Sequence, residues 1–145
     1  MIQACRAAGL PSDDPLLRRA RTFALRCQVE APGDALRHGG FLPSPVPSLA
    51  QSKVGFTDDG DARPLPYTSA TCDGLLALAA LEERGTAEAA AAAAWLVANA
   101  RVPDVALPDV ADLALALRVY TLSALARASP LLPADAARDA AIRAV

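Results

Sequence analysis

The stretch YTSATCDGLLALAALEERGTAEAAAAAAWLVAN, residues 67–99, decides the fold of this chain. Its first half is rich in leucine, and its second half is an alanine run that ends in tryptophan, leucine and valine. Alanine and leucine favour helix and glycine interrupts it, so the stretch predicts two helices that turn at Gly85. Thr86 is suited to cap the second helix. We therefore expect one helical hairpin, with helices over 69–84 and 86–99.

Less regular copies of the same unit flank this hairpin. SDDP at 12–15 predicts a helix start, because aspartate supplies a capping oxygen and proline suits the first helical position. Gly9 is a typical cap at the end of a preceding helix. Consecutive helical pairs indicate a solenoid or toroid, and the missing caps at both ends of the chain lead us to expect a start inside a repeat. The predicted pairs are 2–8 with 15–28, 69–84 with 86–99, and 110–128 with 133–144.

A long segment rich in proline and glycine, residues 29–66, separates the first pair from the second. Proline at every second position over 43–47 favours an extended chain there. A loop of this length inside a compact domain is either functional or mobile. We expect a single all-α domain over 1–145 that this loop interrupts.

The charge and composition argue against two classes of protein. The chain is 53% hydrophobic and 21% charged, as globular domains are, and its net charge of -2 offers no concentrated basic surface for nucleic acid. The alanine run at 89–94 is too short to span a bilayer, and the N-terminus lacks the pattern of a signal peptide. We expect a soluble, cytoplasmic protein with no nucleic-acid partner and no transmembrane segment.

Cysteine usage agrees with a reducing compartment. Cys5, Cys27 and Cys72 show no CxxC spacing, and three cysteines cannot all pair. We interpret them as small buried hydrophobic residues, and one disulfide between two of them remains open.

Three segments resemble one protein family. RARTFALRCQ at 19–28, followed after an insert by GGF at 39–41, is similar to the repeat of terpenoid cyclases and protein prenyltransferase β subunits. That repeat has an aromatic residue, a helix turn and glutamine, then glycine and an aromatic residue (the QW motif of squalene cyclases). TSAT at 68–71 resembles the start of an inner helix of the family, and AWLVAN at 94–99 resembles the end of an outer helix. Their order resembles bacterial squalene-cyclase-type repeat proteins over nearly the whole chain.

The resemblance implies an α/α toroid, in which inner helices ring a central cavity and outer helices surround them. This chain is then a partial toroid, roughly half of one, with 2–8, 69–84 and 110–128 as inner helices. The sequence departs from the family in the long insert 29–38 and in Asn99, which stands where glutamine is expected. Because of these departures, we expect glutamine to link helix ends only in the first repeat.

The acid and metal motifs of that family are missing from the sequence. The cyclases carry Asp-x-Asp-Asp, whereas DDGD at 58–61 is best interpreted as a solvated turn, with a calcium loop disfavoured because no glutamate follows at the right spacing. Cys72 and Asp73 diverge by about 100° on a helix, which makes them poor joint zinc ligands. The single histidine, His38, lies in the loop without a nucleophile elbow. We expect no catalytic residue, no metal and no cofactor.

The best candidate ligand site is the polar start of the inner helix at 69–84. Tyr67, Thr68, Ser69, Thr71 and Asp73 are expected at the rim of the cavity, and helix capping is the alternative for these polar groups. Trp95 is expected in the core rather than as a platform for a ligand.

Two functions remain open from the sequence. The first is a non-catalytic interaction module or a fragment of a larger toroid, which associates with itself or with the rest of the ring through exposed flanks of the helices 2–8 and 133–144. The second is an enzyme like the terpenoid cyclases or prenyltransferases, acting on an isoprenoid. The second needs an aromatic-lined cavity and an acid or metal site, and the predicted inner helices offer few aromatic residues.

Overall fold

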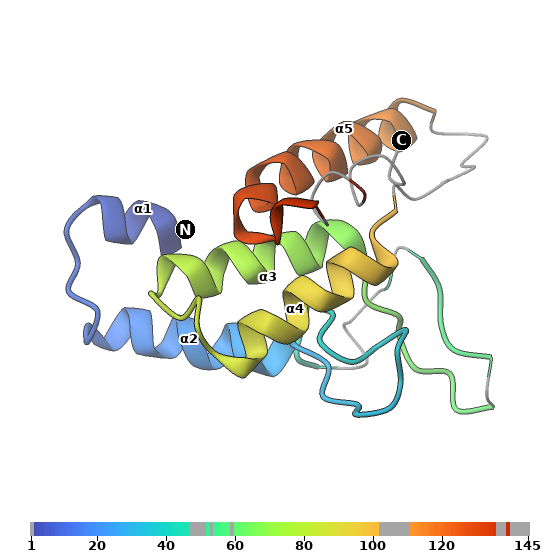
Figure 1. The fold of residues 1–145 in the computed structure, drawn as a ribbon, viewed down its shortest axis with the longest axis horizontal. Coiled ribbons are helices and arrows are strands. Elements are labelled where there is room, and N and C mark those ends of the chain that lie inside the picture. Colours follow the sequence, from blue (N-terminus) through green and yellow to red (C-terminus); the bar gives the residue numbers. More distant parts are fainter. Residues whose placement is uncertain are drawn as a thin grey trace.

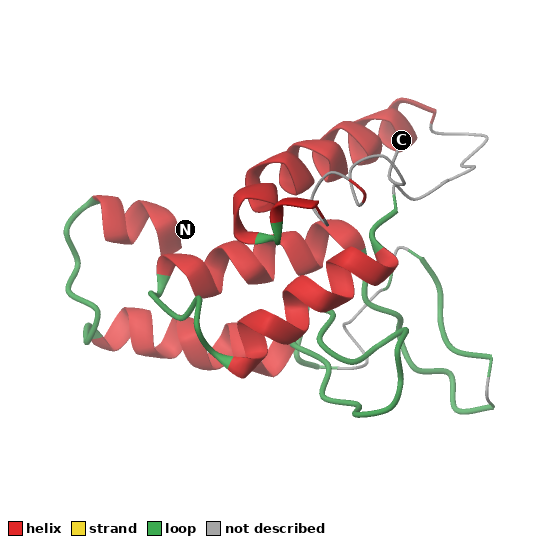
Figure 2. Cartoon of the chain, viewed as in Figure 1, coloured by secondary structure: helices red, strands yellow, loops and turns green. Residues whose placement is uncertain are grey.

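The computed structural model describes residues 2–46, 52, 54–58, 60–101, 111–135 and 139. These residues form five α-helices and no strand, so the described chain is all-α (Figures 1 and 2). The predicted helix over 133–144 lies largely outside the described residues. The elements are α1 (Ile2–Ala7), α2 (Pro15–Cys27), α3 (Thr68–Ala80), α4 (Ala87–Asn99), α5 (Ala111–Ala128) and the short 3-10 helix η2 (Ser129–Leu131).

Helix α3 is the central element of the fold. It packs against α1, α2, α4 and α5, and successive helices run in opposite directions (Figure 1). Eight of its thirteen residues are buried, which explains why its sequence lacks a distinct polar face. The core around it is a continuous cluster that includes Cys72, Leu75, Leu78, Trp95, Leu96, Ala124 and Leu125.

Local capping sets several helix ends as the sequence predicts. The Asp14 carboxylate accepts a hydrogen bond from the Leu16 N–H at 2.7 Å, with Pro15 in the first turn of α2. The Thr86 hydroxyl accepts from the Ala89 N–H at 3.2 Å and caps α4. Gly9, with φ of 86°, ends α1.

The turn of the central hairpin differs from the prediction, because α3 ends at Ala80 and not near Arg84. Glu82, not Gly85, adopts the left-handed conformation, with φ of 65°. The Glu83 N–H then donates to the Leu78 carbonyl at 3.0 Å and the Glu82 N–H to the Ala79 carbonyl at 3.2 Å, which is the Schellman arrangement.

Contacts from the first helical pair hold this turn in place. The Glu82 carboxylate pairs with Arg6 at 2.5 Å and accepts from the Ser12 hydroxyl at 3.1 Å. Glu83 pairs with Arg21 of α2, and this bond raises the pKa of the arginine. A non-glycine residue in the left-handed region is therefore stabilised by partners far away in the sequence.

The first part of the loop folds against α4. The Trp95 indole N–H donates to the Leu36 carbonyl at 2.9 Å, and the Asn99 amide donates to the Ala35 carbonyl at 3.1 Å. A Cβ added at Gly39 would stand 2.4 Å from the Ala91 carbonyl oxygen, so only glycine permits this approach. Trp95 is 5% exposed and belongs to the core.

Gln28 ties two helix ends and the loop together. Its side-chain amide donates to the Glu88 carbonyl in the first turn of α4 at 2.8 Å and to the Gly39 carbonyl at 3.0 Å. The Val29 N–H also donates to the Gly40 carbonyl at 2.8 Å, which closes the loop on itself. The end of α2 is thereby fixed to the start of α4.

Apolar residues on one face of α5 are exposed to solvent. Leu115, Val119 and Leu122 are 62%, 59% and 40% exposed, and their spacing places them in one row. The expected exposed flank on α1 carries no large exposed hydrophobic residue. No helix among the described residues, α5 included, combines the length and apolar character needed to cross a bilayer.

Candidate functional site

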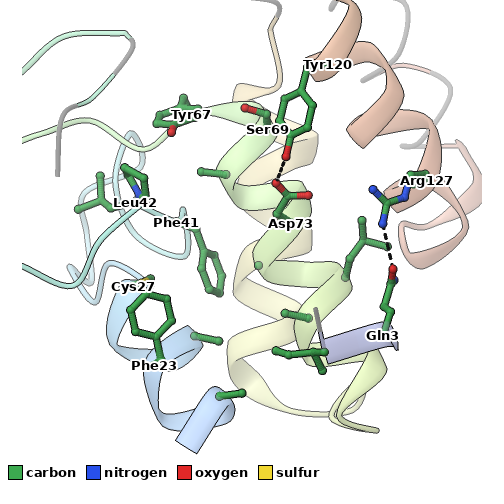
Figure 3. Close-up of a pocket in the computed structure, with 18 of the residues that line it drawn as sticks. Gln3, Phe23, Cys27, Phe41, Leu42, Tyr67, Ser69, Asp73, Tyr120 and Arg127 are labelled. Carbon is green, nitrogen blue, oxygen red and sulfur yellow. Dashed lines mark hydrogen bonds between the residues drawn. The ribbon is translucent and has the colours of Figure 1, made fainter. Parts of the chain in front are cut away.

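A groove of about 770 Å³ runs along α3 between α2 and α5, with the first turn of α1 at one end (Figure 3). Its volume lies within the range of about 300–1,000 Å³ usual for small-molecule sites. Its walls are mainly apolar, with side chains from α1, α2, α3, α5 and the loop. Four aromatic residues line it: Phe23, Phe41, Tyr67 and Tyr120.

Phe41 reaches the groove because the middle of α3 has a glycine. The ring packs on the backbone at Gly74, where an added Cβ would stand 2.4 Å from a ring carbon. The Phe41 N–H donates to the Thr71 hydroxyl at 3.0 Å, and the side chain is 2% exposed. The loop thus contributes a fixed aromatic ring to the face of α3.

Asp73 and Tyr120 form the main polar contact in the groove. The Tyr120 hydroxyl donates to the Asp73 carboxylate, joining α5 to α3 (Figure 3). This hydrogen bond, with burial and the negative charge of Asp73, raises the pKa of Tyr120 to about 12. Burial and then the charge of Asp73 raise the pKa of Tyr67 as well.

The other polar side chains lie farther along the groove. The Arg127 guanidinium of α5 donates to the Gln3 side-chain oxygen of α1 at 2.9 Å (Figure 3). Arg19 of α2 also lines the groove and is exposed. The site therefore has one carboxylate near one end and two guanidinium groups elsewhere on its rim.

Three of the five predicted ligand residues line this groove, namely Tyr67, Ser69 and Asp73. The other two have structural hydrogen bonds instead. The Thr68 hydroxyl accepts from the Arg101 N–H at 2.9 Å and donates to the Arg101 carbonyl at 2.7 Å.

Thr71 also faces a structural partner rather than the groove. Its hydroxyl donates to the Tyr67 carbonyl at 3.1 Å and accepts from the Phe41 N–H. Helix capping, the alternative for these residues, is not their role either, since no side chain caps α3 at Tyr67.

Sequence reasoning missed Phe23 and Phe41 as parts of the site. The segments predicted as inner helices contribute Tyr67 and Tyr120 to the groove, and α2 and the loop add two rings. The aromatic lining of the groove therefore comes from the loop and α2 as well as from Tyr67 and Tyr120. Gly74 was an available signal, because a glycine inside a leucine-rich helix indicates close approach of another group.

Two of the three cysteines are buried structural residues. All three are free thiols, and Cys27 and Cys72 are buried whereas Cys5 is only half-buried. Burial raises the pKa of Cys72 to about 12 and also raises that of Cys27, so neither forms a thiolate readily. Within the part of the chain that the structure describes, no three His, Cys, Asp or Glu residues are grouped to hold a metal.

Comparison of the chain with protein-family models, with curated proteins and with solved structures found no match. The assignment of function therefore depends on the fold and on the chemistry of the groove. These define an all-α protein with an aromatic-lined groove and a single carboxylate inside it.

Proposed function

We propose that this chain is a non-catalytic binding module of the terpenoid-cyclase and prenyltransferase type, a partial α/α toroid whose groove holds a linear isoprenoid-like chain. The alternation of helix directions supports the toroid, because α1, α3 and α5 then run the same way, as inner helices do (Figure 1). The packing of α3 against both α1 and α5 supports the same arrangement. The Gln28 bond to the Glu88 carbonyl supports the resemblance of the first repeat.

The aromatic lining of the groove is the observation that carries the proposal. Four rings converge on one apolar channel, and two of them come from outside the inner helices. Aromatic faces and aliphatic walls suit an unsaturated hydrocarbon chain, which gains free energy by leaving water. A small, strongly hydrated ligand without an apolar chain would leave most of this lining without a partner.

The geometry favours binding over catalysis. A cyclase needs a strong acid, but Asp73, the carboxylate that lines the groove, is hydrogen-bonded to Tyr120 and is not part of an Asp-x-Asp-Asp motif like that of the cyclases. A carbocation also needs a site that excludes water. Tyr120 is 47% exposed and Phe23 is 55% exposed, so solvent reaches the groove. An enzyme acting on an isoprenoid therefore remains the second candidate.

Calorimetric titration with farnesol, a linear isoprenoid alcohol, tests the proposal. Phe23→Ala removes an exposed ring of the groove with little effect on the core, and we expect about tenfold weaker binding. Phe56→Ala is the matched control, because Phe56 is 50% exposed in the loop and does not line the groove. No heat of binding to the unaltered protein, or equal loss in both variants, would refute the proposal.

Self-association is a second role that one observation favours. The exposed row Leu115, Val119 and Leu122 on α5 is an apolar edge next to the packed face of α3 and α5. We expect a second copy of the chain to cover this row, as a partner half-ring would. A strictly monomeric protein at high concentration by light scattering would contradict this role.

The free thiols support the cytoplasm as the compartment of this protein. Cys5, Cys27 and Cys72 form no disulfide, as is usual where thiols stay reduced. Fluorescence microscopy of a tagged full-length protein tests this location, and secretion into the medium would argue against it.

A further inference from the structure

Asp73 is a carboxylate without an ion-pair partner among the described residues. The charged pairs elsewhere in that part of the chain are Arg6–Glu82, Arg21–Glu83, Arg37–Asp34 and Arg63–Asp61. Asp73 is half-buried on α3, and its only hydrogen-bond partner there is the neutral Tyr120 hydroxyl. The Asp73 carboxylate therefore places an unpaired negative charge on the wall of a mainly apolar groove, and a positive charge on a ligand would complement it.

Tyr120 contacts this carboxylate, and Phe41 and Tyr67 line the same groove. Figure 3 shows Tyr120 against Asp73, Phe41 across the groove and Tyr67 beyond it, with Ser69 one turn away on α3. The faces of aromatic rings attract cations. A carboxylate and aromatic rings in one groove therefore favour a bulky organic cation as the ligand. The apolar wall then continues from Asp73 toward Phe23 and Cys27, where a hydrocarbon chain can lie.

The two arginines that line the groove do not form an ion pair with Asp73. Arg127 is seven residues beyond Tyr120 on α5, about 10 Å along the helix axis, and its guanidinium is bound to Gln3. Arg19 lies on α2 and is exposed. Neither arginine pairs with Asp73, so the carboxylate is available to a ligand.

We infer that the ligand of this groove carries a protonated amine, seated between the Asp73 carboxylate and the rings of Phe41, Tyr67 and Tyr120. The inference rests on the proposed function, since the groove must first hold an apolar chain. The inference specifies a positive charge at the polar end of the ligand. The resemblance to terpenoid cyclases and prenyltransferases does not imply this charge. An anionic end is the opposite possibility, and it would be held by Arg19 and Arg127.

Three ligands with one hydrocarbon chain separate these possibilities: farnesylamine, farnesol and farnesyl monophosphate. Near pH 7 the amine is protonated and the phosphate is negatively charged. We expect farnesylamine to bind about tenfold more tightly than farnesol, with the phosphate weakest, as calorimetry measures. Asp73→Asn keeps the shape of the side chain and should remove the preference for the amine, so that farnesylamine and farnesol then bind with similar affinity. Asp58→Asn is the matched control, because Asp58 is an exposed loop carboxylate outside the groove.

Each outcome decides one of the two proposals. Binding of all three ligands with equal affinity, or tightest binding of the phosphate, overturns the amine site and leaves the isoprenoid groove standing. Absence of binding by every ligand overturns the groove itself. If Asp73→Asn fails to fold by circular dichroism, the ranking of the three ligands on the unaltered protein still decides the inference.

Discussion

The Phe41 ring lies directly on the backbone of Gly74, so close that a Cβ at Gly74 would stand 2.4 Å from it. This contact joins the loop that follows α2 to the middle of the central helix. It explains a glycine in a helix that is otherwise rich in leucine and alanine. It also gives the groove one of its four rings.

Gly74→Ala is expected to destabilise the protein. The added methyl group displaces Phe41, and we predict a net loss of about 1–2 kcal/mol in the free energy of unfolding after the better helix propensity of alanine is included. Urea denaturation followed by circular dichroism measures it. Gly85→Ala is the control, since a Cβ there meets no atom within 4 Å, and it should change stability by less than about 0.5 kcal/mol. Equal effects of both substitutions would contradict the packing of Phe41.

Gln28→Ala is expected to loosen the attachment of α2 to α4. The side-chain amide has two backbone carbonyl partners, so we predict a loss of about 1–2 kcal/mol in stability. Gln3→Ala serves for comparison, because Gln3 is exposed and bonds only the Arg127 side chain. Its effect should stay below about 0.5 kcal/mol. An unchanged free energy of unfolding in Gln28→Ala would show that these two hydrogen bonds add nothing to stability.

The turn at Glu82 allows a clean test of backbone strain. Glu82→Gly and Glu82→Ala both lose the bonds to Arg6 and Ser12, and they differ only in tolerance for φ of 65°. We predict that the glycine variant is more stable than the alanine variant by about 1 kcal/mol. Thermal unfolding of the two proteins side by side measures this difference. Equal stability of the two variants would argue against a left-handed Glu82.

Because of the hydrogen bond between Tyr120 and Asp73, we expect the stability of the folded protein to decrease at alkaline pH. The pKa of Tyr120 is about 12 in the folded protein and about 10 in an unfolded chain, so the bond contributes fully below pH 10. Its contribution falls as pH rises through the folded pKa, because the ionised phenol no longer donates to the carboxylate. Ultraviolet difference spectroscopy of tyrosinate should show one ionisation near pH 12 that Tyr120→Phe abolishes. Asp73→Asn should lower the pKa of Tyr120, and an unchanged pKa would contradict the bond.

The sequence allowed the helices to be predicted because their signals are local. The cap at Asp14, the proline after it and the glycine at the end of α1 all act within one turn. The hairpin turn was predicted at Gly85 because glycine interrupts helices. Glu82 takes the left-handed conformation instead, and its partner Arg6 is 76 residues away in the chain, which no local pattern shows.

The candidate site was only partly predictable for the same reason. Ser69 and Asp73 were predicted from the polar start of the helix and the family resemblance, and both line the groove. Thr68 and Thr71 share that pattern, but they bond Arg101 and the Phe41 backbone, contacts made only on folding. The rings supplied by the loop and α2 depend on tertiary packing in the same way.

The central claim is that the groove on α3 binds a linear isoprenoid-like chain. Nuclear magnetic resonance of aromatic side chains during a farnesol titration tests it most directly. We predict shifts for Phe23, Phe41, Tyr67 and Tyr120, which line the groove, and an unmoved indole signal for Trp95, whose N–H is bound to the Leu36 carbonyl. A chemical-shift change at Trp95 without changes at the four rings of the groove, or no change at any of them, would contradict the claim.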